Sequence, residues 1–264
     1  MVIVRGDHVT GTVYLVGAGP GAPDLLTLRA ARALARADIV FHDALVHPET
    51  LALAVNARHV AVGKRSGRHS TAQRFINKQL VDAARKYQTV VRLKGGDPML
   101  FGRAQEEIDA LTVAGIPCEI VPGVSAAFAA SAELQLSLTR RALSRSVVFA
   151  TPREAAGSRS NTWAKAAAAA DTVVLYMAAG TAQAVRDDLI ASGVPATRPA
   201  VIVENAASAQ RKVIPTSLGN LPLAALGVGA GPALVMVGEV YADVQTTGLE
   251  WPLDQAHNVA ALMA

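Results

Sequence analysis

The sequence predicts two α/β domains, each built on a sheet that is covered by helices. At 264 residues the chain is longer than one hydrophobic core usually serves. Short β-branched apolar runs alternate with stretches of helical periodicity, an order typical of parallel sheets. A basic, polar stretch at residues 139–145 separates two such sets. We therefore expect one domain at 11–139 and another at 140–245, with flexible ends at 1–10 and 246–264.

The first half begins with a buried strand that runs into a glycine turn. Residues 11–17 read GTVYLVG, an apolar run that ends in glycine. Asp24 can cap the helix that follows, because apolar residues recur at helical spacing up to Ala37. The alternation then predicts strands at 38–43, 59–62, 89–93 and 116–120, with helices at 71–86, 102–114 and 125–134.

The second half repeats the alternation after the basic stretch. Strands are expected at 146–150, 172–177, 200–204 and 233–240, with a helix at 181–192 and an alanine-rich segment at 163–170. Each half therefore has enough strands for a sheet of its own.

The composition is typical of a globular protein. Apolar residues make up 51% of the chain and charged residues 17%. Cys118 is alone, so we interpret it as a buried structural thiol rather than a nucleophile. No run approaches the ~20 apolar residues of a membrane span, and the first residues lack the pattern of a signal peptide. We expect a soluble cytoplasmic protein.

The net charge of +4 is compatible with an acidic partner. The basic residues are scattered and have no interleaved aromatic residues, which argues against a nucleic-acid groove and suits a small polyanion. The six histidines show no ligand-like spacing, so we expect no metal site.

Two glycine-rich loops at strand ends are candidate binding elements. They span residues 17–21 (GAGPG) and 94–98 (KGGDP), and loops at the carboxyl ends of parallel strands can bracket one ligand. Asp97 suits an ammonium or ribose hydroxyl of that ligand, because an ionised carboxylate only accepts hydrogen bonds. A tight structural turn without a ligand stays open as the alternative for either loop.

A dinucleotide-binding unit is a second alternative. It would use Asp43, which lies 22 residues after Gly21 at the end of the second strand. Pro20 and Pro23 argue against it, because proline removes the amide donors that a pyrophosphate needs.

Four motifs together resemble the tetrapyrrole methylase family, and within it the uroporphyrinogen-III C-methyltransferases. They are residues 16–28 (VGAGPGAPDLLTL), 43–46 (DALV), 62–65 (VGKR) and 93–98 (LKGGDP), which match in both order and spacing. A looser likeness continues to residue 243. The resemblance implies two unlike α/β domains with parallel or mixed sheets, a ligand in the cleft between them, and homodimers.

The activity that the resemblance implies is methyl transfer from S-adenosylmethionine to two pyrrole carbons of uroporphyrinogen III, C2 and C7. The products would be precorrin-2, a precursor of sirohaem and cobalamin, and S-adenosylhomocysteine. Because the sulfonium already activates the methyl group, the protein has mainly to align the reactants and help a proton leave.

The resemblance also assigns roles to residues of this chain. Asp43 matches a proton acceptor and Lys64 a proton donor, although Asp43 could instead only orient a loop and Lys64 only attract carboxylates. Arg65 and Arg141 are expected to bind substrate carboxylates, which pair with arginine forks. The residues expected to hold the cofactor are Pro20, Gly95, Gly96, Asp97, Leu100, Ser125, Ala126, Met177, Ala206 and Pro232. Met177 could equally be core filler.

Four positions depart from the family pattern. Arg140 and Arg153 stand where histidines are usual, Ala178 replaces a glycine, and Ala207 replaces a threonine. These changes bear on substrate affinity and turnover. They leave open a methyltransferase for a later precorrin, or a non-catalytic protein that binds S-adenosylmethionine or a tetrapyrrole.

Overall fold

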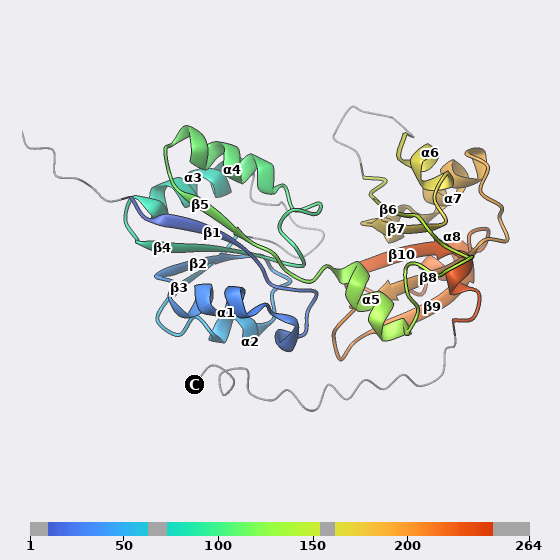
Figure 1. Ribbon diagram of the computed structural model, residues 1–264, viewed down its shortest axis with the longest axis horizontal. Coiled ribbons are helices and arrows are strands. Elements are labelled where there is room, and N and C mark those ends of the chain that lie inside the picture. The colour runs from blue at the N-terminus through green and yellow to red at the C-terminus, as the bar shows by residue number, and fades with distance from the viewer. Residues whose placement is uncertain (1–9, 63–72, 154–161, 245–264) are drawn as a thin grey trace, which may run out of the picture. The chain divides into compact units, whose positions relative to one another are not determined.

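The computed structural model describes residues 10–62, 73–153 and 162–244. The chain divides into two compact units, of which the first reaches Ser125 and the second begins at Ala126 (Figure 1). The expected ends, 1–10 and 246–264, lie outside the described residues except for residue 10.

Unit 1 is built on a five-stranded sheet in which all the paired strands are parallel. The order is β3-β2-β4-β1-β5. The strands are β1 (Thr12–Gly17), β2 (Ile39–His42), β3 (Arg58–Ala61), β4 (Thr89–Lys94) and β5 (Cys118–Val121), and the helices are the 3-10 turn η1 (Pro23–Leu25), α1 (Leu28–Ala35), α2 (Pro48–Ala52), α3 (Gln73–Ala84) and α4 (Ala104–Val113).

Helices cover both faces of this sheet (Figure 1). Alternate residues of a strand point to opposite faces. Val90 therefore packs in a cluster with Leu80 of α3 and Leu111 of α4, whereas its neighbour Val91 packs with Leu34 of α1. The chain leaves β1 toward one face and β4 toward the other. Such a reversal between neighbouring parallel strands opens a crevice at their carboxyl ends, where ligands bind in this class of fold.

The first helix begins later than the sequence predicted. Asp24 lies exposed in η1 and makes no cap. The cap of α1 is Thr27, whose hydroxyl accepts a hydrogen bond from the backbone N–H of Ala30 at 3.2 Å. The chain is extended at Leu26 and Thr27, so the helix can start only at Leu28.

Unit 2 is built on a five-stranded mixed sheet in the order β6-β7-β10-β8-β9. Only the β6–β7 pair is parallel. The strands are β6 (Val147–Ala150), β7 (Thr172–Tyr176), β8 (Pro199–Glu204), β9 (Lys212–Ser217) and β10 (Ala233–Gly238), and the helices are α5 (Ala126–Leu134), α6 (Thr162–Ala168), η2 (Ala179–Thr181), α7 (Ala182–Ala191), α8 (Leu221–Ala225) and η3 (Glu239–Tyr241).

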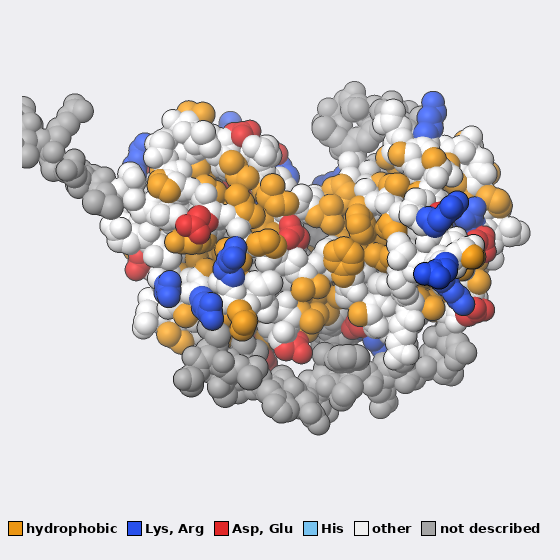
Figure 2. All heavy atoms as spheres, in the orientation of Figure 1, with side chains coloured by type: hydrophobic (Ala, Val, Ile, Leu, Met, Phe, Trp, Pro, Cys, Tyr) orange, Lys and Arg blue, Asp and Glu red, His pale blue; other side chains and the backbone are white. Residues whose placement is uncertain are grey.

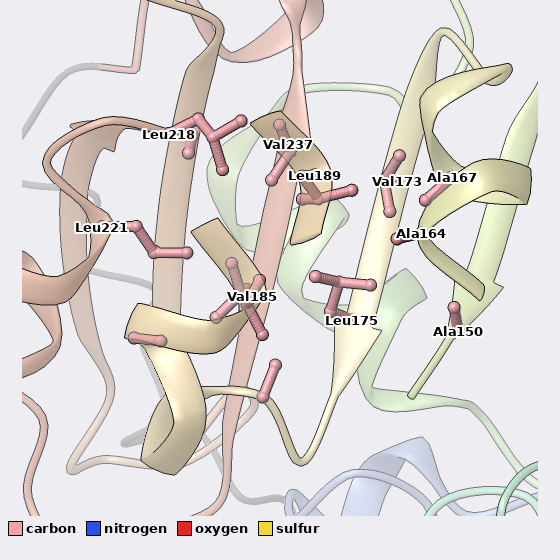
Figure 3. Packing of buried hydrophobic residues seen from close by; sticks show 14 of the residues in the cluster. Ala150, Ala164, Ala167, Val173, Leu175, Val185, Leu189, Leu218, Leu221 and Val237 are labelled. Atoms are coloured by element: carbon pink, nitrogen blue, oxygen red, sulfur yellow. The ribbon is translucent and has the colours of Figure 1, made fainter. Parts of the chain in front are cut away.

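The core of unit 2 has two layers of apolar contacts. On one face of the sheet, Leu175 and Val237 pack against Val185 and Leu189 of α7 (Figure 3). On the other face, residues of α5 share a cluster with sheet residues such as Met236. This packing explains why the unit begins at residue 126 rather than at the expected 140: α5 buries its apolar side chains against the second sheet.

The basic stretch expected as a linker also belongs to unit 2. Arg140 and Ser144 form an isolated β-bridge. The buried Ser144 hydroxyl lies 2.8 Å from the hydroxyl of Thr172 in β7. None of the described helices is long and apolar enough to cross a membrane.

Among the described elements, the helices α2 and α8, the 3-10 turns η2 and η3 and the strand β9 were not predicted. Strand β9 contains Pro215, which disfavours a strand in sequence analysis but is tolerated at a sheet edge, where β9 lies.

Candidate active site

Three loops of unit 1 meet at the carboxyl edge of its sheet. Gly19 and Gly96 exchange backbone hydrogen bonds of 3.2 and 2.7 Å, which join the loops after β1 and β4. A Cβ added to Gly17 would lie 2.6 Å from the Cα of Gly123, in the loop after β5. The backbones of Gly17 and Gly123 are too close for any side chain, so glycine is required at these two positions. The two glycine-rich loops singled out in the sequence are therefore brought together.

Asp97 ties two of these loops to each other. Its Oδ1 accepts a hydrogen bond from the N–H of Met99 at 2.8 Å, and its Oδ2 accepts one from the N–H of Gly123 at 2.9 Å. Sequence reasoning considered this carboxylate only as a contact for a ligand. The structure gives it a part in shaping the loops.

The loop after β4 presents bare backbone to open space. A Cβ added to Gly95 or Gly96 would meet no heavy atom of a described residue within 4 Å, and Gly96 has a left-handed φ of 67°. Around it lie the other residues of unit 1 that were expected to hold a cofactor. Pro20 follows the bridge at Gly19, Leu100 donates its N–H to the Asp97 carbonyl at 3.3 Å, and Ser125 is buried two residues after Gly123.

A buried charged network lies behind this edge. Asp43 follows β2, and its Oδ1 lies 2.6 Å from Nη2 of Arg92. Arg92 and Lys94 both contact Glu107 of α4, at 3.1 Å each. Burial lowers the pKa of Lys94, and the neighbouring Arg92 charge lowers it further. We name Asp43, Arg92, Lys94 and Glu107 the charged network.

Of these four residues, sequence analysis gave a chemical role only to Asp43, although Lys94 begins the second glycine-rich loop. A signal was present, because the apolar strand β4 reads TVVRLK, and charges inside a buried strand need partners. Which carboxylates would serve as partners could not be read from the sequence.

Unit 2 gathers its expected cofactor residues at one edge as well. Strand β10 runs antiparallel to β7 and β8, so its start lies beside their ends. Met177 follows β7, Ala206 follows β8, and Pro232 precedes β10. The N–H of Asn205 donates to the Pro232 carbonyl at 2.8 Å. Ala126 begins α5 at this edge, where the next N–H, of Ala127, donates to the Tyr176 hydroxyl at 3.3 Å.

The backbone of this edge is strained. Met177, Asn205 and Ala207 all have left-handed φ values, of 57°, 54° and 57°. Such conformations are costly for residues other than glycine or asparagine and tend to occur at functional sites. Met177 is 45% exposed, so it is not core filler.

Glu204 holds the glycine-rich loop that leads to Pro232. Its buried carboxylate accepts hydrogen bonds from the N–H groups of Gly229 and Gly231, both at 2.9 Å. The loop is packed so closely that a Cβ on Gly231 would lie 2.1 Å from Oδ1 of Asn205. Sequence reasoning assigned no role to Glu204.

Apolar side chains reach the surface of both units (Figure 2). In unit 2 the ring of Phe149 makes edge-to-face contacts with Phe128 and Tyr176, with centroids 5.9 and 6.5 Å away. Phe128 is 55% exposed. The unit therefore offers an aromatic surface at the first turn of α5.

Three cationic residues were also expected to bind substrate or to act in catalysis: Lys64, Arg65 and Arg141. Lys64 and Arg65 lie outside the described residues. Arg141 is exposed on the turn between Arg140 and Ser144 and makes no ion pair with a residue that the structure describes. Over the same described part of the chain, no three His, Cys, Asp or Glu residues are grouped as a metal site would need.

Comparison with known proteins identifies the family. Residues 12–222 match the family model described as Tetrapyrrole (Corrin/Porphyrin) Methylases. The chain belongs to this family. The family and the fold class predicted from the sequence are thereby confirmed, and the dinucleotide-binding alternative is set aside.

Two relatives of this tetrapyrrole methylase are siroheme synthases. That of Pseudomonas fluorescens is 44% identical over 233 residues, which cover 88% of this chain and 50% of the relative. Siroheme synthase 3 of Aeromonas hydrophila is 42% identical over 231 residues, which cover 87% of this chain and 49% of the relative. The methylase thus spans about half the length of these relatives.

Solved structures match nearly end to end. A uroporphyrin-III C-methyl transferase from Thermus thermophilus, complexed with S-adenyl homocysteine, has a TM-score of 0.77 and 37% identity, covering 87% of this methylase and 98% of that chain. A cobalt precorrin-4 methyltransferase has the same TM-score of 0.77 but 27% identity, covering 91% of this methylase and 99% of that chain.

One departure of this methylase from its family pattern has no structural cost. Ala178 is fully buried and has φ −97° and ψ −26°, a conformation open to any residue. Ala207 has a left-handed φ of 57°, and Arg140 and Arg153 are exposed. The departures that can affect binding are therefore those at the surface and at the strained edge.

Proposed function

We propose that this chain methylates uroporphyrinogen III at C2 and C7, using S-adenosylmethionine and giving precorrin-2. The observation that carries the proposal is the 37% identity with the Thermus thermophilus enzyme over 98% of that chain. It is supported by the bare glycine loop at the carboxyl edge of unit 1.

The later-precorrin alternative has weaker support. The cobalt precorrin-4 methyltransferase matches the fold equally well, with the same TM-score of 0.77, but its identity of 27% is lower than 37%. Because the two enzymes share the fold, the fold cannot distinguish their substrates, and the comparison depends on sequence identity. The higher identity with the uroporphyrin-III C-methyl transferase favours uroporphyrinogen III as the substrate.

The residues present fit S-adenosylmethionine. Gly95 and Gly96 leave open space in which the backbone can approach a ligand closely, and Asp97 holds their loop in place. In our proposal the cofactor is held by Pro20, Gly95, Gly96, Asp97, Leu100 and Ser125 of unit 1 and by Ala126, Met177, Ala206 and Pro232 of unit 2. When bound, it supplies a methyl group activated by the sulfonium charge.

The protein's own part is to bind, orient and move protons. Arg65 and Arg141 bind carboxylates of the substrate, and the exposed Phe128 contacts its apolar ring and excludes water. Asp43 accepts the proton that leaves the methylated pyrrole, and Lys64 donates one. The geometry of Asp43 suits this role, because Arg92 holds Oδ1 while Oδ2 has no hydrogen-bond partner among the described residues.

A turnover assay tests the proposal. The purified protein is incubated without oxygen with enzymatically generated uroporphyrinogen III and labelled S-adenosylmethionine. We expect two labelled methyl groups per tetrapyrrole and the spectrum of precorrin-2. Binding of S-adenosylhomocysteine without any transfer would instead identify a non-catalytic binding protein. Asp43→Asn and Lys64→Met test the proton transfers, and near-normal turnover in both would remove these residues from the mechanism.

The assembly and the biological context belong to the same proposal. We propose a cytoplasmic homodimer whose product serves sirohaem or cobalamin synthesis. The siroheme synthase relatives support the sirohaem route. Light scattering of the protein as it elutes from a size-exclusion column measures the mass, and a monomer over the working concentration range would contradict the dimer.

A further inference from the structure

The charged network has an unusual balance of buried charge. Arg92 and Lys94 alternate with apolar residues on β4, so both point to the face that α3 and α4 cover. Both side chains are only 4% exposed. Facing them is one fully buried carboxylate, that of Glu107. One buried anion cannot compensate two buried cations, so a second is needed.

Asp43 supplies that second negative charge. It comes from β2, which pairs with β4 in a register that sets Phe41 opposite Arg92. The Asp43 carboxylate receives Nη2 of Arg92 at 2.6 Å and is 32% exposed, so it stands between the buried cluster and solvent. The network thus reaches from α4 along one face of the sheet to the carboxyl edge, where the substrate is proposed to bind.

The guanidinium of Arg92 is fixed on three sides. Its Nε donates to Glu107 Oε1 at 3.1 Å, its Nη1 to the Leu93 carbonyl at 3.1 Å, and its Nη2 to Asp43. Glu107 Oε1 is in turn held by Gln73 Nε2 at 3.1 Å. The planar guanidinium is held at each of its three nitrogen atoms, which fixes its orientation. Because Nη2 holds Oδ1 of Asp43, the position of the guanidinium also sets the direction of Oδ2.

We propose that Arg92 is the positioning residue for Asp43, and that Glu107 anchors it. Arg92 does not touch the substrate; it acts by aiming the free oxygen of Asp43 at the departing proton. This inference rests on the proposed function of Asp43 as proton acceptor. It assigns a task to two buried residues that are otherwise only structural.

The matched control is Lys94→Met. Lys94 is as buried as Arg92 and contacts the same Glu107, but it does not contact Asp43. Removing either cation should therefore disturb folding to a similar extent. Lys94 interacts with Asp43 only through longer-range charge, so the loss of Arg92, which holds Asp43 directly, should be coupled to Asp43 much more strongly.

A double-mutant cycle tests the proposal. We measure kcat and the KM for S-adenosylmethionine in Arg92→Met, Asp43→Asn and the double variant, with binding of S-adenosylhomocysteine as a check on folding. Misplacement of a catalytic group costs about tenfold to 100-fold. In the unaltered background we expect Arg92→Met to lower kcat by that factor with little change in KM. In the Asp43→Asn background, adding Arg92→Met should lower kcat by less than about twofold. Lys94→Met should have nearly the same effect in both backgrounds, because its interaction with Asp43 is only a longer-range one.

Equal losses from Arg92→Met in both backgrounds would overturn the proposal, because Arg92 would then act independently of Asp43. Full kcat in Asp43→Asn would also overturn it, since there would be no proton acceptor to position. Failure of the proposed function is distinguishable, because the unaltered protein would then transfer no methyl group. If Arg92→Met does not fold, Arg92→Lys replaces it in the cycle. This variant keeps the positive charge but loses the planar guanidinium, so kcat should fall by less than the tenfold to 100-fold expected on complete removal of the arginine side chain.

Discussion

Gly95→Ala separates the stability of the fold from the binding of the cofactor. A Cβ at this position meets no heavy atom within 4 Å over the part of the chain that the structure describes, and Gly95 is not among the glycines with a positive φ. The substitution should therefore cause no clash within the protein. It should even stabilise the fold by about 0.4–1 kcal/mol, because alanine has fewer conformations to lose on folding. For a chain of this size that keeps the Tm of the ligand-free protein within about 4 °C of the unaltered value.

Cofactor binding should respond very differently. If S-adenosylmethionine lies against the backbone at Gly95, the added methyl group occupies space that the ligand needs. Overpacking of this kind costs about 1–3 kcal/mol, which raises the Kd about fivefold to 150-fold. Isothermal titration with S-adenosylhomocysteine measures this Kd, and thermal melting of the free protein measures the stability.

Gly180→Ala is the control for this experiment. Its Cβ also meets nothing within 4 Å in the described parts of the chain, and it lies in the short turn η2 of unit 2. It should raise the Tm as slightly as Gly95→Ala does, for the same reason, and leave the Kd unchanged. Unchanged affinity in Gly95→Ala would refute the placement of the cofactor at this loop. A large fall in Tm would refute the inference that the space beside Gly95 is open.

Three further predictions concern stability. Gly17→Ala forces a Cβ to within 2.6 Å of Gly123 and should destabilise the protein by about 1–3 kcal/mol or more in urea unfolding; an unchanged midpoint would mean that the loops can separate freely. Glu204→Gln leaves one oxygen for two backbone N–H donors and should cost about 1–3 kcal/mol, with faster hydrogen exchange at the loop amides; protection equal to that of the unaltered protein would contradict the clamp. Hydrogen bonds from the N–H of Arg145 and from Ser146 hold the pKa of Asp171 below its ordinary 3.8. A lowered pKa stabilises the fold above the ordinary value, and this stabilisation is lost as the pH falls from there through the lowered pKa. Asp171→Asn should therefore destabilise the protein at pH 7, and its difference from the unaltered protein should shrink as the pH falls below 3.8; a difference independent of pH would contradict this.

Much of unit 1 could be predicted because local patterns dominate there. Strands β1, β2 and β4 are short apolar runs, and β1, β3 and β4 are each followed by a segment with the periodicity of a helix. Unit 2 was predicted less fully. Strand β9 contains Pro215 and lies at a sheet edge. The antiparallel pairing of β8, β9 and β10 depends on how the chain connects these strands, which periodicity does not report.

For the candidate site, the sequence alone determined which residue types stand at the ends of strands. The glycines, Asp97 and Asp43 follow strands β1, β4 and β2, and parallel strands bring such ends to one edge. The family motifs added the expected chemistry. These conclusions need only the order of residues along the chain.

Only the tertiary structure decided which side chains meet. Asp43 and Arg92 are 49 residues apart, and they become partners because β2 and β4 are neighbours although β3 follows β2 in the chain. The same holds for Asp97 and Gly123, and for the choice of Thr27 as a cap. A charged residue in a buried strand predicts that a partner of opposite charge exists. Which residue becomes that partner depends on strand order and register, and both are set by the packing of the whole sheet.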